Sequence, residues 1–201
     1  DVKSMDWIAN KMGFTVEHKP MDWDTIIPSL NTNKIDMVCS GMSITEARAE
    51  QVNFSDPYWV MKPAVSVRAD SDLTMDQVHK GKIKFGIQRG TSEADWLENN
   101  KEPNGWNMEI VYYDTQPLAI EDLLNGRIDA VGTDEAPAKD AMAHGKAIKT
   151  IGTFAEVTKY GVAVRKADTK LLEAINEGYK LLMADPYWKE LQDEYFSKPA
   201  E

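Results

Sequence analysis

Apolar and polar positions divide the chain into short helices and strands. Apolar side chains recur at helical spacing over residues 2–12, as far as Gly13, whereas residues 15–18 alternate as in a half-buried strand. The same pattern predicts helices at 25–30, from 45, within 69–82, after 90 and at 117–124, 136–143, 168–183 and 186–196, and strands at 35–39, 64–68, 83–87, 109–113, 128–131, 148–150 and 160–164. Strands that alternate with helices indicate an α/β fold with mainly parallel sheets and a ligand crevice at the strand carboxyl ends.

One stretch of the chain is repeated. Residues 26–38 and residues 119–131 each read as a helix, a tight turn, a basic residue and an Ile-Asp-X-Val strand. Short αβ units also recur by chance in such folds, so the residues that follow each copy matter. The first copy leads into residues 40–43 (Ser-Gly-Met-Ser) and the second into residues 132–134 (Gly-Thr-Asp). Both strands therefore deliver small or polar groups to their ends, where two facing crevices could share one ligand.

Composition narrows the class of protein. The chain has 201 residues, of which 42% are hydrophobic and 28% charged, so it can bury a core and is not disordered as a whole. A net charge of −10 without a basic stripe argues against binding to nucleic acid or to an anionic membrane surface. No run approaches the roughly 20 apolar residues of a membrane span, and no export signal precedes Asp1, so we expect any such signal to have been removed or not to be included in this sequence.

A single cysteine and a few scattered histidines offer little reactive chemistry. Cys39 lies in an apolar run and is expected to be a buried structural thiol. The chain shows no His, Cys and carboxylate cluster at metal-ligand spacing, and we expect neither a metal nor a cofactor. None of the three histidines stands beside a nucleophile motif, which argues against an enzyme.

Two polar turns at predicted helix starts could hold a carboxylate. Thr45 can cap the helix that carries Arg48, and a guanidinium beside free N–H groups suits an anion. The alternative is a surface arginine that pairs with Glu46 or Glu50. Residues 90–92 (Gly-Thr-Ser) offer the same device in the second half of the chain, although they also describe an ordinary turn and cap.

An acid and an aromatic residue complete the candidate site. Asp134 ends an apolar strand and could pair with an ammonium group, or it could merely cap the helix that begins near Ala136. Trp23 could stack against a ligand, with core packing as the alternative. Arg48 for a carboxylate and Asp134 for an ammonium would together accommodate a zwitterion.

Several short blocks share a characteristic order and spacing: Met21-Asp22-Trp23, Ile27-Pro28-Ser29-Leu30, Lys34-Ile35-Asp36, Ser40-Gly41-Met42-Ser43-Ile44-Thr45-Glu46-Ala47-Arg48, Phe54-Ser55-Asp56-Pro57-Tyr58, Gly90-Thr91-Ser92, Gly126-Arg127-Ile128-Asp129-Ala130-Val131 and Tyr160-Gly161-Val162-Ala163-Val164. Over nearly the whole chain, these blocks resemble the polar amino-acid solute-binding proteins of ATP-driven (ABC-type) importers. The resemblance implies a periplasmic or extracellular protein with the two-lobed periplasmic-binding-protein type II fold.

The resemblance also implies how the lobes and the ligand are arranged. Lobe 1 is expected to hold residues 1–67 and 162–201, and lobe 2 residues 68–161, with hinge crossings near residues 67–69 and 159–162. A free amino acid would be enclosed between the lobes and delivered to a membrane permease.

By position, Arg48 resembles the family's clamp on the ligand α-carboxylate and Asp134 the partner of its α-ammonium. Trp23 resembles the aromatic residue against the ligand side chain, and Gln88 and Arg89 are weaker candidates for selectivity. Arg89 hints at an acidic or amide side chain, unless it is simply exposed. The ligand-binding residues implied are Trp23, Ser40, Gly41, Ser43, Arg48, Gln88, Arg89, Thr91, Ser92 and Asp134.

The start of the chain departs from the family pattern, in which a strand and a loop precede the helix that begins here at Asp1. A missing segment would leave a sheet edge unpaired and remove one pocket wall. We expect lobe 1 to be completed by an N-terminal segment or by a second chain.

Two other function classes remain open from the residues. A few dehydratases resemble this fold, but acid–base chemistry would require a further positioned group in the cleft. A sensor or receptor module could use the same zwitterion clamp. The free transport protein is the preferred interpretation.

Overall fold

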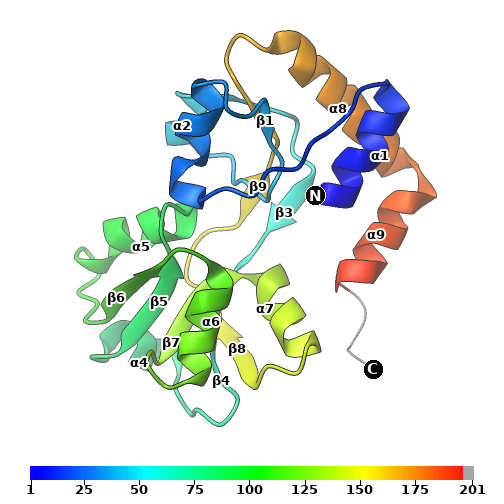
Figure 1. Cartoon of the computed structure of the whole chain (residues 1–201). Helices are drawn as coiled ribbons and strands as arrows, with labels where there is room; N and C mark the ends of the chain where they lie inside the picture. The colour runs from blue at the N-terminus through cyan, green and yellow to red at the C-terminus, as the bar shows by residue number, and fades with distance from the viewer. Residues whose placement is uncertain (197–201) are drawn as a thin grey trace. The chain divides into compact units, whose positions relative to one another are not determined.

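The structure is a computed structural model that describes residues 1–196. It contains two compact units, which Figure 1 shows with their labelled elements. Unit 1 consists of residues 1–61 and 158–196, and unit 2 of residues 62–157. The chain therefore passes from one unit to the other twice.

The borders predicted after residues 67 and 161 lie too late along the chain. β4 (Pro63–Arg68) pairs with strands of unit 2, so a border after residue 67 would separate it from them. Similarly, β9 (Thr158–Tyr160) pairs with β3 (Trp59–Met61) of unit 1. Hydrogen bonds between strands thus decide a border that the hydrophobic pattern does not mark.

The described strands of unit 1 are antiparallel. β1 (Met37–Val38), β10 (Ala163–Val164) and β2 (Asn53–Phe54) form a three-stranded sheet in the order β1-β10-β2. The expectation of a mainly parallel sheet is therefore wrong for these strands. The reason is topological, because β10 comes from the return segment of the chain and runs against both of its neighbours.

Residues 15–18 were predicted as a strand and do not form one. The alternation behind that prediction is present, since Phe14 and Val16 are partly buried and pack on the core of unit 1 while Thr15 and Glu17 are exposed. This segment makes no strand ladder in the described structure. Alternating burial gives a strand its faces, but a strand also requires a hydrogen-bonded neighbour.

Helix packing supplies the larger core of unit 1. α1 (Val2–Met12), predicted from its helical spacing, packs against α8 (Thr169–Ala184). The two helices approach closely at Gly178, where a Cβ would lie 2.3 Å from Ile8 Cγ2. The remaining helices of unit 1 are η1 (Trp23–Thr25), α2 (Ile26–Asn31), α3 (Glu46–Ala49) and α9 (Pro186–Phe196).

Unit 2 is built on a mixed five-stranded sheet in the order β6-β5-β7-β4-β8. β5 runs parallel to β6 and β7, whereas β4 runs antiparallel to β7 and β8, so the parallel prediction is correct for only part of this sheet. The strands are β4 (Pro63–Arg68), β5 (Lys84–Gln88), β6 (Glu109–Tyr113), β7 (Ala130–Asp134) and β8 (Ile148–Gly152).

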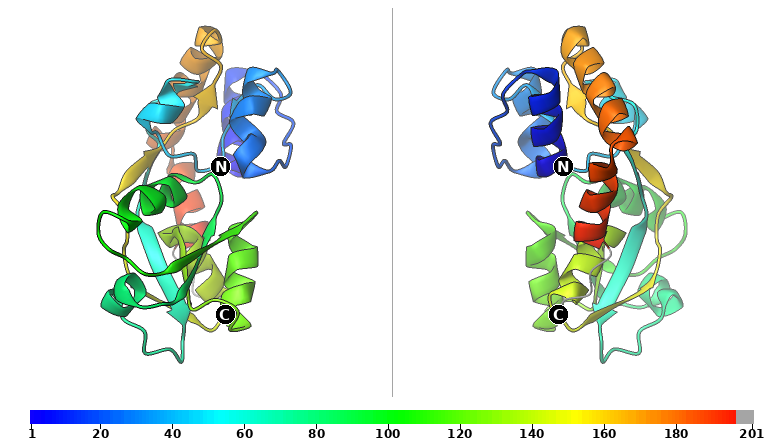
Figure 2. Two further views of the ribbon diagram at one scale, coloured as in Figure 1. Left: turned by 90° about the vertical axis from the view of Figure 1, so that its left-hand side faces the viewer. Right: turned by 90° about the vertical axis from the view of Figure 1, so that its right-hand side faces the viewer.

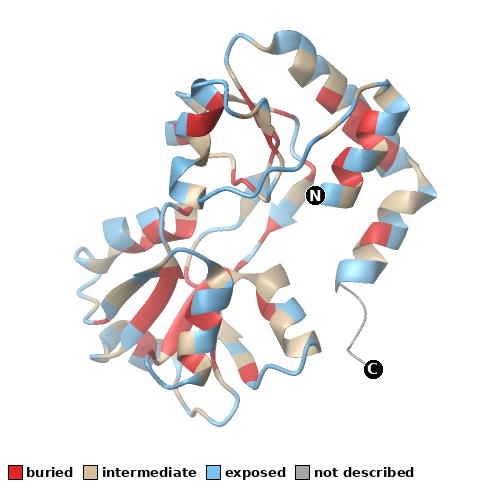
Figure 3. Cartoon of the chain, viewed as in Figure 1, coloured by how far each residue is buried: buried red, intermediate tan, exposed pale blue. Residues whose placement is uncertain are grey.

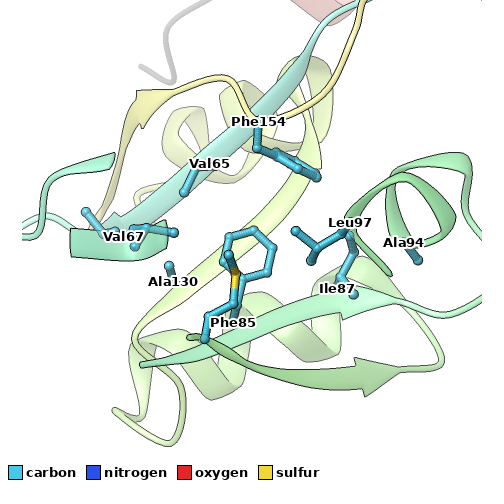
Figure 4. Packing of buried hydrophobic residues seen from close by; sticks show 10 residues of the cluster. Val65, Val67, Phe85, Ile87, Ala94, Leu97, Ala130 and Phe154 are labelled. Carbon is cyan, nitrogen blue, oxygen red and sulfur yellow. The ribbon is translucent and has the colours of Figure 1, made fainter. Parts of the chain in front are cut away.

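Helices cover both faces of this sheet (Figure 2). Buried side chains of α4 and α5 pack with Phe85, Ile87 and Val65 on one face, and Figure 4 shows this cluster. Buried side chains of α6 pack with Val131 and Ile148 on the other face. Figure 3 shows that β5 and β7 are buried along most of their length. The helices are α4 (Met75–Lys80), α5 (Ser92–Lys101), α6 (Gln116–Leu124) and α7 (Glu135–Ala143). No helix in the described part of the chain is long and apolar enough to span a membrane.

The sequence repeat is also a structural repeat, with α2 and β1 in unit 1 matching α6 and β7 in unit 2. Two residues after its last helical residue, each helix is followed by a residue with left-handed backbone, Asn33 (φ 60°) or Gly126 (φ 70°). Both then close with the two backbone hydrogen bonds of a Schellman turn. These bonds run from Asn33 to Leu30 (3.2 Å) and from Lys34 to Ser29 (3.0 Å) in the first copy, and from Gly126 to Leu123 (3.1 Å) and from Arg127 to Asp122 (2.9 Å) in the second.

A guanidinium from outside each copy binds matching carbonyl groups. Its Nη1 donates to one carbonyl at the end of the helix and to another just before the strand. Arg165 does so at Leu30 and Ile35, and Arg68 does so at Leu123 and Ile128. In each copy, one arginine therefore links the end of the helix to the start of the strand through matching carbonyl groups.

Candidate functional site

The candidate residues of unit 1 centre on Arg48. Thr45 Oγ1 accepts a hydrogen bond from the amide of Arg48 (3.3 Å) and so caps α3. The Arg48 side chain is buried, and its Nη1 donates to the carbonyl of Ser43 (2.9 Å). Its guanidinium carbon lies 5.7 Å from the centre of the Trp23 ring. The alternative of a surface arginine is therefore wrong, because Arg48 is 9% exposed.

The loop before Arg48 is fixed by the return strand. Ser43 is buried, and its Oγ lies 3.1 Å from Thr158 Oγ1 of β9. The amide of Ile44 donates to the carbonyl of Lys159 (2.8 Å). Ser40, in contrast, is exposed. The loop thus presents Ser43 and the clamp arginine from a backbone held by hydrogen bonds.

Gly41 occupies a position whose backbone and close neighbour favour glycine. Its φ is 58°, and a Cβ there would lie 3.1 Å from the ring of Tyr160. Its amide donates to Asp1 Oδ2 (2.6 Å) and also lies 3.3 Å from Tyr58 Oη. Because these groups already accept from the amide, Gly41 contributes the shape of the loop in this structure.

In unit 2, residues 90–92 form the turn between β5 and α5. Gly90 has a φ of 71°, and Thr91 caps the helix by accepting from the amide of Ala94 (3.2 Å). The Thr91 hydroxyl also donates to the carbonyl of Gln88 (2.9 Å). Ser92 Oγ donates to Glu93 Oε2 (3.2 Å). The predicted turn and cap are both present, and Thr91 is buried.

The two weaker selectivity candidates are turned toward β6. Arg89 Nε lies 3.0 Å from Asp114 Oδ1, and both side chains are largely exposed. The amide group of Gln88 donates to the carbonyl of Asp114 (2.9 Å). Arg89 is thus the exposed arginine of the alternative interpretation, and its charge is balanced by Asp114. Arg89 therefore gives no reason to expect a ligand with an acidic or amide side chain.

Asp134 stands at the end of β7 and at the cap position of α7. Its carboxylate makes no capping hydrogen bond to that helix, so capping alone does not explain the residue. A carboxylate at a helix start is favoured by the positive end of the helix dipole. Because β7 and β5 are parallel neighbours, Asp134 and the turn at residues 90–92 follow strands that end at the same edge of the sheet.

The other reactive side chains belong to the scaffold. Burial raises the pKa of the Cys39 thiol, whose sulfur lies 3.3 Å from Tyr179 Oη in the core of unit 1. His18 contacts Asp6, and the His79 ring stacks on Trp106 at 4.2 Å. Within the described residues, no group of three or more His, Cys, Asp or Glu side chains could hold a metal ion.

The chain matches the family model of the bacterial extracellular solute-binding proteins, family 3, over residues 1–198. The chain belongs to this family. It is similar to the L-arginine-binding protein of Pseudomonas aeruginosa, with 32% identity over 212 residues, which cover 98% of this chain and 78% of that protein.

Two solved members of this fold show the same architecture. One is described as the substrate-binding protein of an amino acid ABC transporter, with a TM-score of 0.88, 29% identity and coverage of 98% of this chain and 87% of that one. The other is the ancestral amino-acid-binding protein AncCDT-1, a precursor of cyclohexadienyl dehydratase, with a TM-score of 0.85, 29% identity and coverage of 98% and 84%. The two-lobed α/β prediction is confirmed.

Sequence reasoning missed two residues of this family-3 solute-binding protein. Tyr160 packs its ring over Gly41 and so shapes the loop, whereas the sequence marks Tyr160 only as part of the block at residues 160–164. Glu93 is 8% exposed, whereas an acid in the first turn of a helix usually faces solvent. Nothing in the local sequence marks it as buried, since Asp95 in the same turn is exposed.

Proposed function

We propose that this protein binds a free amino acid, with residues of both units contacting the ligand. Arg48 binds the α-carboxylate, because a guanidinium donates two parallel hydrogen bonds that match a carboxylate. Asp134 binds the α-ammonium. Ser43 and the turn at residues 90–92 contribute polar groups, and Trp23 packs against the ligand side chain.

The observation that carries the proposal is the arrangement around Arg48. Burying a guanidinium is costly unless its donors are satisfied. Here the Thr45 cap fixes the backbone of Arg48, and the Ser43 carbonyl and the Trp23 ring contact its guanidinium. A fixed, buried cation is suited to an anionic ligand group, and ordering it in advance lowers the entropic cost of binding.

The two units act as the two lobes of the proposed mechanism. A ligand that contacts Arg48 in unit 1 and Asp134 in unit 2 favours the conformation in which both contacts exist. We propose that this ligand-bound form delivers the amino acid to a membrane permease and that the protein acts outside the cytoplasm. The relation to the binding protein of an amino acid ABC transporter supports this role.

The same chemistry argues for binding without catalysis. The proposed contacts are ion pairs and hydrogen bonds to the ends of the ligand, and they include no positioned general base or nucleophile. AncCDT-1 shows that the fold lies close to a dehydratase, yet it is itself an amino-acid-binding protein. We therefore assign no reaction to this chain.

Isothermal titration calorimetry against the twenty amino acids tests the proposal. For the amino acid that binds wild type, Arg48→Ala should lower the affinity by roughly a hundredfold, because it leaves the desolvated ligand carboxylate unpaired. Arg48→Lys keeps the charge but loses the two parallel donors of the guanidinium, so its affinity should lie between those of wild type and Arg48→Ala. Arg127→Ala is the matched control, since Arg127 is exposed and pairs with Asp122. An Arg48→Ala protein that folds and binds within a few-fold of wild type would contradict the assignment.

A further inference from the structure

The strand that returns the chain to unit 1 carries two side chains that contact the loop before Arg48. This strand is β9, and the alternation of a strand places Thr158 and Tyr160 on one face and Lys159 on the other. Lys159 is exposed, whereas the ring of Tyr160 lies against Gly41. The proposed function uses the loop and leaves the residues of β9 without a role.

Backbone hydrogen bonds hold the loop and β9 in a fixed register. The amide of Ile44 donates to the carbonyl of Lys159 (2.8 Å). On the other side of Ser43, the amide of Gly161 donates to the carbonyl of Met42 (3.1 Å). Ser43 itself forms an antiparallel bridge with the strand. The backbone of Ser43 is therefore held at a set position beside β9.

Ser43 is also held through its carbonyl and its hydroxyl. The carbonyl accepts from Arg48 Nη1 (2.9 Å), and the hydroxyl oxygen lies 3.1 Å from Thr158 Oγ1. Ser43 is 3% exposed. A buried hydroxyl has lost water as a partner and depends on the polar groups around it. Ser43 therefore connects the clamp arginine to Thr158.

The direction of the bond between the two hydroxyls decides what Ser43 can offer to a ligand. A hydroxyl has one hydrogen to donate and two lone pairs that accept. A carboxylate can only accept, so Ser43 can donate to it only if Thr158 is the donor in the bond between the two side chains. In that arrangement, Thr158 also fixes the orientation of the Ser43 hydroxyl.

We propose that Thr158 is a positioning residue for amino-acid binding: its hydroxyl donates to Ser43, which in turn donates to the ligand α-carboxylate beside Arg48. This inference rests on the proposed function, in which Arg48 binds that carboxylate. Thr158 acts through Ser43 and makes no ligand contact of its own. The net contribution of one such hydrogen bond corresponds to roughly three- to tenfold in affinity.

Calorimetry on single and double variants tests this role with the amino acid that binds wild type. Thr158→Val keeps the shape of the side chain and should weaken binding roughly three- to tenfold, and Thr158→Ser should restore it. Ser43→Ala should weaken binding by roughly tenfold, because a hydrogen bond to a charged group is lost. In the Ser43→Ala protein, Thr158→Val should have no further effect, because the group that it orients is gone.

A second pair of hydroxyls, in unit 2, provides the matched control. The side-chain oxygens of Ser66 in β4 and Thr150 in β8 lie 3.3 Å apart, and neither residue is among the proposed ligand contacts. Thr150→Val removes the same kind of hydrogen bond and should leave the affinity unchanged. Thermal unfolding of Thr150→Val and Thr158→Val compares their stability, so that a weaker fold is not mistaken for weaker binding.

The role of Thr158 is refuted if Thr158→Val binds like wild type, or if its effect adds in full to that of Ser43→Ala. It is also refuted if Ser43→Ala binds like wild type. In each of these cases, a loss of binding in Arg48→Ala leaves the proposed function standing. A wild-type protein that binds no amino acid refutes both.

Discussion

The first copy of the repeat, in unit 1, and the second copy, in unit 2, build the same turn from different residues. Asn33 and Gly126 take the left-handed backbone at matching positions, and each copy then makes the same pair of hydrogen bonds. Arg165 and Arg68 bind matching carbonyls from outside. The backbone geometry is repeated although most side chains differ.

The two copies carry different chemical groups where their strands end. Gly41 in the first copy matches Asp134 in the second. Gly41 presents an amide that donates to Asp1, whereas Asp134 presents a carboxylate at the start of α7. The first copy continues to the cation Arg48, while the second unit supplies the acids.

This difference separates scaffold from chemistry. The helix, turn and strand set the position of the strand end, and this backbone arrangement forms with different residues in the two copies. In the proposed function, the residues at and after the strand end decide which charge is presented. In the proposed function, two similar supports therefore offer opposite charges to the two ends of a zwitterion.

The largest effect is expected from making the second strand end like the first. Asp134→Gly should weaken amino-acid binding by roughly a hundredfold, because the α-ammonium of the ligand loses the acid proposed to pair with it. Asp134→Asn should be milder, since the amide oxygen still accepts a hydrogen bond. Calorimetry on both variants measures the loss. Wild-type affinity in Asp134→Gly would contradict the assignment of Asp134 to the α-ammonium.

The arginines that bind the two copies should differ in their contribution to stability. Arg165 is 18% exposed, donates to Ile35 at 2.6 Å and pairs with Asp36 and Asp168. Arg68 is 34% exposed, and its hydrogen bonds to the matching carbonyls measure 3.3 and 3.4 Å.

Arg165→Ala should therefore lower the free energy of unfolding by about 2–4 kcal/mol and Arg68→Ala by about 1 kcal/mol. Urea unfolding followed by circular dichroism measures both. Equal losses would show that the two arginines are equivalent despite their different contacts.

The left-handed turn positions should differ in how strongly substitution changes stability. Gly126→Ala should cost about 1 kcal/mol, because alanine is strained at a φ of 70°. An added Cβ would meet only an ordinary contact with Arg68, so the cost comes from the backbone. Asn33→Gly should change stability by at most a few tenths of a kcal/mol, because glycine accepts this backbone readily. Thermal unfolding of the two variants separates these cases, and a neutral Gly126→Ala would refute the strain argument.

The smallest expected difference between the two copies is in how their stability depends on acidic pH. Asp122 in the second copy matches Ser29 in the first, and the hydrogen bond from Arg127, together with one from Tyr113, lowers the pKa of Asp122. A carboxyl group whose pKa is lowered by folding stabilises the protein above its unfolded pKa of about 4, and that contribution is lost as the pH falls through the folded value.

Asp122→Ser should therefore lower the melting temperature slightly at neutral pH, and the difference from wild type should vanish in acid. A difference that stays constant with pH would assign the effect to packing. Ser29→Ala, in the first copy, should show no such acid dependence.

Much of this molecule was predictable from local pattern. Helical spacing gave α1 with its bounds, and the repeated Ile-Asp strand located both copies of the shared turn. The block around Arg48 pointed to a clamp, and the resemblance identified the family that the comparisons then confirmed. Residues 15–18 show where such reasoning fails, because alternation indicates faces but does not supply a neighbouring strand.

The candidate site was predictable in its charges but not in its accessibility. Arg48 and Arg89 are both candidate ligand contacts by sequence, yet Arg48 is buried while Arg89 is exposed and paired with Asp114. Glu93 and Asp95 share one helical turn, and burial distinguishes them. A helix start alone carries no sign of which of its acids the surrounding structure covers.

The sequence by itself determined the elements, the repeat and the family, because these depend on periodicity and on local turn chemistry. Tertiary structure decided the strand directions, the borders of the units and the burial of Glu93, because these depend on partners far away in the chain. The return segment sets β10 against β1 and β2 and places Tyr160 over Gly41. Hydrogen bonds and burial between distant segments cannot be read from the residues on either side alone.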